Sequence, residues 1–167
     1  MVVVSGAAGA AQRGSTLTRS SAIYAAVIRQ LVTEENTSGA NDPGFTRIYV
    51  VNGPVADAGD ASGNIDQRPE HRFSSRLRRA LLARLDDLPP IRFVRDAASV
   101  IEDSPTGTVS GGGAVVRVGP IPDGARRVEV GGSIYIANLA GQWLTYVVER
   151  VRGRWRVTGT TGPIAIS

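Results

Sequence analysis

The chain has 167 residues, enough for one domain that buries a hydrophobic core without disulfides or a structural metal. Its 19 basic residues are all arginine, and the absence of lysine and cysteine excludes the P-loop, Schiff-base chemistry, thiolate nucleophiles and cysteine zinc sites. The net charge of +4 and the pI of about 10.3 would suit a polyanion binder, but arginine without lysine is also typical of a GC-rich, bacterial genome.

The first residues, MVVVSGAAGAAQRGS, leave two interpretations open. The small residues of GAAGAAQ resemble a signal-peptidase site, whereas MVVV is too short for the apolar region of a signal peptide. We expect residues 1–19 to be a disordered tail or the remnant of a signal peptide, and we favour an exported protein over a cytoplasmic one. No apolar run in the sequence approaches the roughly 18 residues of a membrane-spanning helix.

The clearest helical periodicity lies in SSAIYAAVIRQLVTEEN, which predicts a helix over residues 20–35 with one broad apolar face. Six apolar residues repeat there at intervals of four: Ile23, Tyr24, Val27, Ile28, Leu31 and Val32. The β-branched and aromatic run FTRIYVVN then predicts a strand over 45–52, which Gly-Pro ends.

Residues 53–72 are rich in Gly, Pro, Asp and Asn, and we expect them to form a flexible surface loop. Leucines at helical spacing after a serine cap predict a second helix over 74–87, which two prolines end. IRFVR predicts a strand over 91–95, and SPTGTVSGGG a loop over 104–113.

From Ala114 onward the apolar residues alternate, which predicts four further strands separated by turns that contain glycine. They lie near residues 114–118, 126–137, 142–151 and 154–159. Helices that precede an antiparallel meander indicate an α+β fold. Since no linker divides the chain, we predict a single α+β domain over residues 20–167.

The last hairpin can be aligned from its turn at Arg152-Gly153. This turn predicts Arg150 opposite Trp155 as a cation–π contact, Glu149 opposite Arg156 as an ion pair, and Val148 opposite Val157 as an apolar pair. The turn before it, NLAG, similarly predicts Glu129 opposite Arg150 and Ile136 opposite Trp143.

The strand over 142–151 carries apolar residues on both faces, with Leu144, Tyr146 and Val148 on one and Trp143, Val147 and Val151 on the other. Either a bulge at Gly131-Gly132 resets the alternation, or both faces are covered. Helices would cover one face. A dimer partner could cover the second, or it could form a concave pocket.

The stretch DASGNIDQRPEH, residues 60–71, partly resembles a calcium-binding loop. Asp60, Ser62 and Asp66 occupy oxygen-ligand positions of such a loop, but Ala58 and Pro69 occupy the two positions that close the cage. We therefore interpret the stretch as an acidic loop and predict no metal site. His71, the only histidine, has no identifiable partner that would make it a general base.

Arginines cluster in two segments, on the predicted second helix and on the last hairpin. The clusters are Arg76, Arg78, Arg79 and Arg84, and Arg150, Arg152, Arg154 and Arg156. They could bind a polyanion, but we favour a solvated helix face and cross-strand pairing with Glu129 and Glu149. Nucleic acid is therefore not the partner we expect, and no row of aromatic stacking residues accompanies the arginines.

The order of the predicted elements resembles that of the nuclear transport factor 2-like proteins, and so does the ending LAGQWLTYVVERVRGRWRVTGTTG in particular. These proteins have a cone-shaped α+β fold, which ketosteroid isomerases share. A cystatin-like layout fits the sequence nearly as well. This resemblance implies a curved antiparallel sheet with helices in its concave side, a pocket between them, and dimerisation through the sheet. It assigns no catalytic residue. The candidate pocket residues are Tyr24, Tyr49, Asp96, Tyr135, Trp143 and Tyr146.

We predict from these observations a non-catalytic module for ligand binding or assembly, without a cofactor, whose partner is a second copy of the chain or a small apolar ligand. The first alternative is a small-molecule enzyme of the isomerase or hydrolase type that uses a pocket carboxylate of raised pKa beside a tyrosine, with Asp96 and Tyr24 as candidates. The second alternative is an arginine-mediated polyanion binder.

Overall fold

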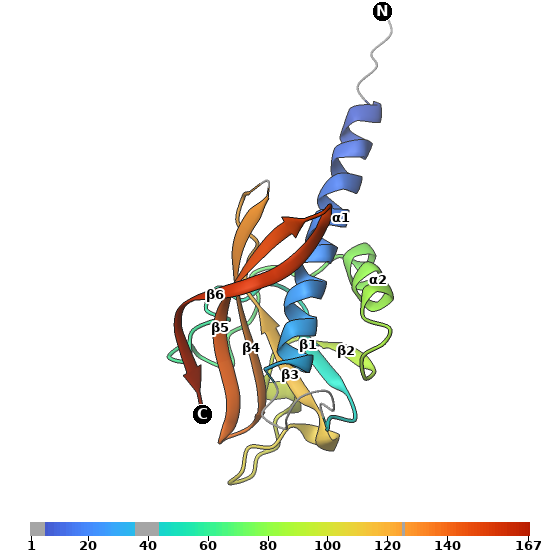
Figure 1. Ribbon diagram of the computed structural model, residues 1–167. Coiled ribbons are helices and arrows are strands. Elements are labelled where there is room, and N and C mark those ends of the chain that lie inside the picture. The colour runs from blue at the N-terminus through green and yellow to red at the C-terminus, as the bar shows by residue number, and fades with distance from the viewer. Residues whose placement is uncertain (1–5, 36–43, 125) are drawn as a thin grey trace, which may run out of the picture.

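Two α-helices lie against one face of a curved six-stranded sheet (Figure 1). The computed structural model describes residues 6–35, 44–124 and 126–167, without the side chains of residues 6–11 and 13. The helices are α1 (Gly6–Thr33) and α2 (Ser75–Arg84). The strands are β1 (Ile48–Val51), β2 (Ile91–Val94), β3 (Ala114–Val118), β4 (Arg127–Ala137), β5 (Ala140–Val151) and β6 (Arg154–Ile166).

The strand order in the sheet is β2-β1-β3-β4-β5-β6, and the predicted α+β class is confirmed. The prediction of an antiparallel sheet is wrong at one end, because β1 runs parallel to both β2 and β3. The connections from β1 through α2 to β2, and from β2 through residues 95–113 to β3, return the chain in the same direction, as parallel pairing requires. The strands from β3 to β6 are antiparallel, as predicted.

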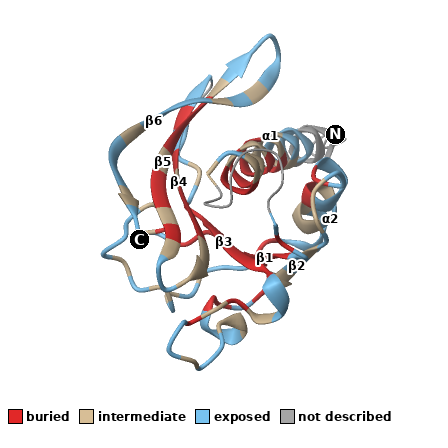
Figure 2. Ribbon diagram, turned by 60° about the horizontal axis from the view of Figure 1, so that its bottom comes forward, coloured by how far each residue is buried: buried red, intermediate tan, exposed pale blue. Residues whose placement is uncertain are grey.

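The apolar face of α1 fills the concave side of the sheet, which curves around the helix (Figure 2). Ile23, Val27, Ile28 and Leu31 are fully buried there. Gly132 in β4 allows the helix to approach closely, because a Cβ at this position would lie 3.1 Å from Leu31 Cδ1 and 3.2 Å from Val27 Cγ1. The helical periodicity thus identified the face of α1 that forms the core.

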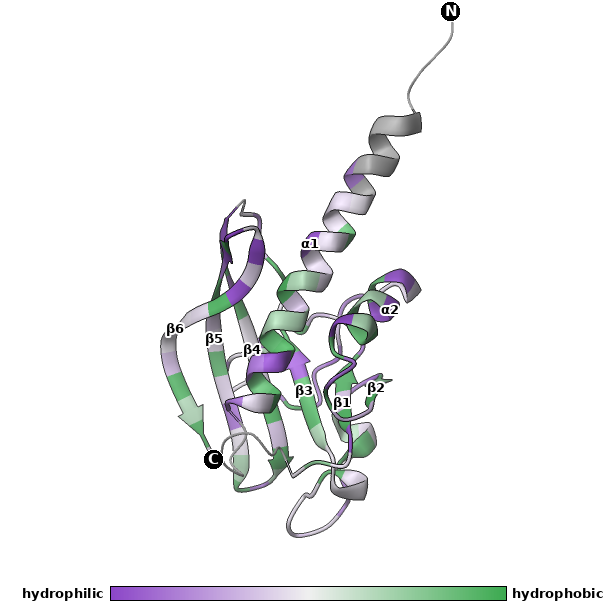
Figure 3. Ribbon diagram, turned by 45° about the vertical axis from the view of Figure 1, so that its right-hand side comes forward, coloured by the Kyte–Doolittle hydropathy of each residue, from purple (hydrophilic) through white to green (hydrophobic). Residues whose placement is uncertain are grey.

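The N-terminal start of α1 differs from the prediction. The helix begins at Gly6, so residues 6–19 are helical and do not form the disordered tail that we expected. The first turns of α1 extend beyond the sheet (Figure 1), and residues 14–19, which follow them, are mostly polar or small (Figure 3). These turns carry no repeat of large apolar residues, as expected where a helix is not packed into a core. Residues 1–5 lie outside the described residues, and export stays a prediction.

The second helix begins as predicted and ends earlier. Ser74 is its N-cap, and its side chain accepts a hydrogen bond from the backbone N–H of Leu77. Leu81 is buried against the core, and the helix ends at Arg84 instead of residue 87.

Loops of the same chain cover the convex face of the sheet. Val55 and Ala58 from the loop over 53–72 are buried with Ala97 and Val109 from the loop over 95–113. Tyr49 and Val115 form the sheet side of this second core. The loop over 53–72 is therefore more than a surface loop, because its few apolar residues fill part of the core.

Arg117 lies beneath this loop on the convex face and is only 2% exposed. Its Nε donates to Ser133 Oγ at 3.1 Å, and its Nη1 donates to the backbone oxygen of Asn64 at 2.9 Å. Burial lowers the pKa of the guanidinium, against the attraction of Asp57 and Asp66. The loop is thus held on the sheet by a buried charge as well as by apolar contacts.

The predicted register of the last hairpin is confirmed in all three pairs. Arg152 (φ 49°) and Gly153 (φ 81°) both adopt positive φ, as a two-residue type I′ turn requires. The predicted interactions across the strands are different, however. Arg19, not Arg150, lies over the Trp155 ring at 5.6 Å, and the described residues include no ion pair between Glu149 and Arg156.

The predicted register of β4 with β5 is wrong. Glu129 pairs with Val147, and Ser133 pairs with Trp143. Ala137 pairs with Ala140, so the turn is centred on Asn138-Leu139, one residue earlier than the predicted pairs require, and an irregularity between Tyr135 and Ala137 shifts the pairing by one further residue. Both faces of β5 are covered, as one of the two alternatives required: Tyr146 packs toward α1, while Trp143 and Val147 are buried on the convex face.

We predict that Gly59→Ala lowers the free energy of unfolding by about 2 kcal/mol, because an added Cβ would lie 2.5 Å from the backbone oxygen of Leu144 and would displace the loop from the sheet. Gly159→Ala is the matched control, because its Cβ meets no atom within 4 Å. Urea unfolding measures both variants. Equal stability of Gly59→Ala and the wild type would contradict the close packing of this loop.

Candidate functional site

A groove of about 1130 Å³ runs between α1 and the β5–β6 hairpin. Its lining extends along α1 from Gly14 to Glu34, a length of about 30 Å at the rise of an α-helix. The hairpin contributes one wall, and Arg84 at the end of α2 contributes to the other side. The sheet curves around α1, so that the β5–β6 hairpin lies alongside the helix and β6 contacts it (Figure 2).

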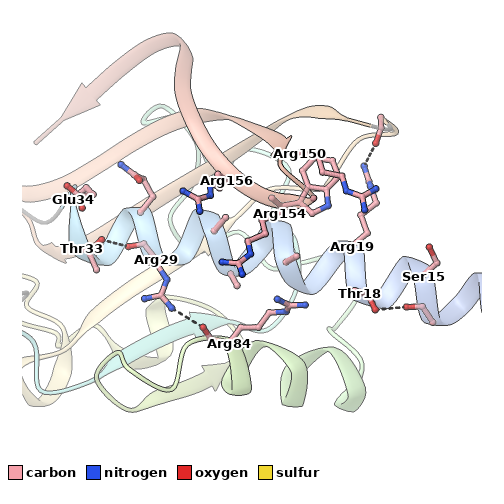
Figure 4. A pocket seen from close by; sticks show the side chains of 18 residues that line it. Ser15, Thr18, Arg19, Arg29, Thr33, Glu34, Arg84, Arg150, Arg154 and Arg156 are labelled. Atoms are coloured by element: carbon pink, nitrogen blue, oxygen red, sulfur yellow. Dashed lines mark hydrogen bonds between the residues drawn. The ribbon is translucent and has the colours of Figure 1, made fainter.

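Six arginines line this groove, and Figure 4 shows them around one common space. They are Arg19 and Arg29 from α1, Arg84 from α2, and Arg150, Arg154 and Arg156 from the hairpin. The two arginine clusters of the sequence, some 70 residues apart, each contribute to it. The tertiary structure thus concentrates positive charge that the sequence only showed in separate segments.

Among the described residues that line the groove, Glu34 is the one with a carboxylate. In proportion to the whole chain, six arginines would be accompanied by about five carboxylates. Among the described residues, Arg29 alone of the six forms an ion pair, a bidentate one with Asp87. The groove is therefore a region of positive potential.

The carboxylates that we expected to neutralise the hairpin are bound elsewhere. Glu129 lies 2.9 Å from Arg127, and Glu149 lies 3.9 Å from the same arginine. Thr158 donates a further hydrogen bond to Glu149. Pairing with these two glutamates therefore does not explain the arginines of the hairpin.

Arg19 is held in place by contacts with uncharged groups, so that no carboxylate among these partners neutralises its charge. Its Nη2 donates to the backbone oxygens of Pro122 at 3.0 Å and Gly124 at 2.9 Å, and its guanidinium lies over the Trp155 ring. These partners hold the guanidinium in place. Arg84 is held similarly, because its Nε donates to Ser21 Oγ at 3.2 Å.

Small side chains form the floor of the groove between these arginines. Thr18, Ala22, Ala25 and Ala26 are neighbours on the groove side of α1. Alanine allows a ligand to approach the helix closely and provides an apolar contact surface. The groove thus combines an apolar floor with cationic walls.

The six residues predicted for a ligand pocket do not share one cavity. Tyr24 and Tyr146 belong to the core between α1 and the sheet, whereas Tyr49 and Tyr135 belong to the core on the convex face. Trp143 also faces the convex side, because it is one strand position away from Leu144. The reason is the alternation of side chains along each strand, which divides neighbouring aromatics between the two faces.

Burial affects both tyrosines of the helix-side core. It raises the pKa of Tyr24 to about 12, against a hydrogen bond with the backbone of Ile121. It also raises the pKa of Tyr146, and the charge of Glu35 adds to this effect. Both hydroxyls therefore stay protonated at neutral pH, as core residues.

Asp96 joins the two loops of the convex face. Its side chain is buried and accepts hydrogen bonds from Arg68 Nε and Arg95 Nε, both at 3.0 Å, and from the backbone N–H of Ser99. Burial alone would raise the pKa of Asp96, but the hydrogen bonds outweigh it and hold the pKa below its usual value. Asp96 is therefore a charged structural anchor and lacks the raised pKa that the enzyme alternative requires.

The stretch over 60–71 forms local turns. Asp60 Oδ1 accepts hydrogen bonds from the backbone and hydroxyl of Ser62, and Asn64 Oδ1 accepts one from the backbone of Asp66. Within the described ranges, no group of three or more His, Asp or Glu residues is arranged to hold a metal ion. The described helices also include none that is long and apolar enough to span a membrane.

We expect Asp96→Asn to lower the free energy of unfolding at pH 7 by about 1–2 kcal/mol, because it weakens charge-assisted hydrogen bonds to two arginines. The folded pKa is lowered, so this contribution is complete above the ordinary aspartate pKa of about 4 and is lost as the pH falls through the folded value.

Urea unfolding of wild type and variant between pH 7 and pH 3 measures this difference, which should shrink toward the acid end. Asp103→Asn makes the same change at an exposed position without such partners and is the control. A pH-independent difference for Asp96→Asn would contradict the lowered pKa.

Neither the protein-family models, nor the curated proteins, nor the solved structures include a match to this chain. The candidate site accordingly rests on its geometry. Six guanidinium groups from four elements surround a groove that can take a ligand of about 30 Å in length. The chemistry that this arrangement supports is the binding of anions by hydrogen bonds and charge.

Proposed function

We propose that the protein is a non-catalytic binding module that takes an anionic ligand in the groove between α1 and the β5–β6 hairpin. The observation that carries the proposal is the convergence of six arginines with one carboxylate in a single groove. This proposal keeps the function that we favoured from the sequence, a binding module, and adds the anion-binding chemistry of the second alternative, a polyanion binder.

The repulsion among the arginines of the groove supports a functional role for them. Like charges in one groove repel each other, and ordinary surfaces intersperse the two signs. The structure holds Arg19 and Arg84 in place through neutral oxygen atoms, so their positive charge remains available to a ligand. An anion that enters the groove would relieve the repulsion and gain charge-assisted hydrogen bonds.

The enzyme alternative has less support. It needs a carboxylate of raised pKa beside a tyrosine, and its two candidates are separated by the sheet: Tyr24 packs in the helix-side core, while Asp96 binds the loops of the convex face. The pKa of Asp96 is lowered. A binding role requires neither residue.

The layout also supports the proposed relation to nuclear transport factor 2-like proteins, because helices occupy the concave side of a curved sheet that ends in long antiparallel strands. This resemblance implies a pocket between the helices and the sheet, and we propose that the groove between α1 and the β5–β6 hairpin takes that role. Dimerisation through the sheet remains part of this proposal. The loops that cover the convex face restrict where a second copy could pack.

We predict that the double variant Arg150→Ala/Arg154→Ala elutes from a heparin column at distinctly lower salt than the wild type at neutral pH, because both side chains line the groove and neither has an ion-pair partner among the described residues. The measurement is the salt concentration at the elution peak. Circular dichroism of the variant checks that the fold is retained.

The control is Arg47→Ala/Arg92→Ala, which removes the same charge from exposed positions at β1 and β2, outside the groove. It should elute close to the wild type. If the two double variants shift equally, retention reflects net charge alone and the groove is not an anion site.

A further inference from the structure

We infer that the anionic ligand of the groove is an acidic peptide segment of a partner protein, which lies lengthwise along α1. This inference rests on the proposed function and specifies its partner. The alternative polyanion, a nucleic acid, shares the negative charge but differs in width, in its stacking bases and in its uniform charge. Each difference can be compared with the groove.

The positions of the arginines favour a narrow ligand. Arg19 and Arg29 project from α1, whereas Arg150, Arg154 and Arg156 belong to the opposite wall, and Figure 4 shows both sets around the same space. A ligand that contacts both sets must enter between the walls. A nucleic acid duplex carries its phosphates on a wide convex surface, so it would reach the rim of one wall at a time.

The aromatic content of the groove disfavours a single-stranded nucleic acid. Binding of single strands relies on a row of aromatic platforms on which successive bases stack. Trp155 is the one aromatic residue in the lining, and the guanidinium of Arg19 already covers its ring at 5.6 Å. The groove therefore offers charge without a stacking surface.

The floor of the groove favours a ligand with apolar side chains. Ala22 and Ala26, which are half-buried, form an apolar strip along α1 between the cationic walls, and Ala25 beside them is buried. A peptide can cover this strip with small or aliphatic side chains while its carboxylates contact the arginines. A sugar–phosphate backbone would leave the strip uncovered and gain nothing from it.

Charge along the groove is graded, which also favours a peptide. Arg19 lies near the end of the groove that Gly14 lines, whereas Glu34 lies at the other end, next to the C-terminus of α1, where the helix dipole adds further negative charge. A uniformly charged backbone would be repelled at the Glu34 end. A peptide can place its carboxylates near Arg19 and an uncharged or basic residue near Glu34.

Two labelled probes of equal negative charge test the inference by fluorescence anisotropy with the full chain. One is a twelve-residue peptide of alternating Glu and Ala, and the other is a single-stranded oligothymidylate with the same number of charges. We expect the peptide to bind at least about tenfold more tightly at moderate salt, a difference of about 1.4 kcal/mol. A peptide with Gln in place of Glu should not bind.

Two variants distinguish the contribution of the apolar floor to binding from that of the arginines in the walls. Ala22→Met/Ala26→Met fills the floor with good helix formers and leaves the charge unchanged, so it should weaken peptide binding several-fold and leave oligonucleotide binding unaffected. Arg150→Ala/Arg154→Ala should weaken the binding of both probes by about tenfold, whereas Arg47→Ala/Arg92→Ala should weaken neither.

The outcomes distinguish this inference from the function on which it rests. If the oligonucleotide binds as tightly as the peptide or more tightly, and the groove variant weakens it, the peptide inference is overturned while the anion-binding groove stands. Peptide binding that is unaffected by the filled floor would also overturn the inference. If neither probe binds, or the control variant weakens binding as much as the groove variant, both proposals fail.

Discussion

The packing of α1 into the concave side of the sheet is the contact on which the rest of the structure depends. Ile23, Val27, Ile28 and Leu31 are fully buried there, and at about 1.5–3 kcal/mol for each side chain their burial is of the same order as the stability of a whole domain. The helix also touches α2 and each strand from β3 to β6. Without it, neither the curvature of the sheet nor the position of α2 would be supported, and the groove would have no inner wall.

The groove follows from a mismatch between this helix and the sheet. α1 packs its large apolar side chains against the sheet, whereas small residues on the neighbouring face, such as the half-buried Ala22 and Ala26, leave space between the helix and the hairpin. The I′ turn at Arg152-Gly153 directs the hairpin alongside the helix and places its arginines opposite those of α1. The large apolar side chains of α1 thus form the core, and its small side chains form the floor of the cationic groove.

The convex face shows a different use of charge. Arg117 and Asp96 are both buried, and each is hydrogen-bonded to the loop over 53–72, through Asn64 and Arg68 respectively. Removal of Arg117 would leave the buried hydroxyl of Ser133 without this partner, and removal of Asp96 would leave Arg68 and Arg95 without their carboxylate, which makes such contacts specific for one loop conformation. The acidic stretch that resembled a calcium loop therefore has a structural explanation: its backbone and side chains hold a cover over the sheet. On this face Asp96 forms ion pairs with two arginines, and the charges of Asp57 and Asp66 act on Arg117, in contrast to the carboxylate-poor groove.

The sequence by itself determined the local features: the periodicity of α1, the cap of α2, the strands and the register of the last hairpin all depend on residues close together in the chain. It could not determine the start of α1 at Gly6, because a helix that extends beyond its sheet needs no apolar repeat. It also missed the exact position of the turn between β4 and β5 and the irregularity between Tyr135 and Ala137, which together shift β4 against β5. Only the tertiary structure decided which distant residues meet. It separated Tyr24 and Tyr49 onto two faces and joined Arg19, Arg84 and Arg150 in one groove, because contacts between distant segments depend on how the sheet curves around α1.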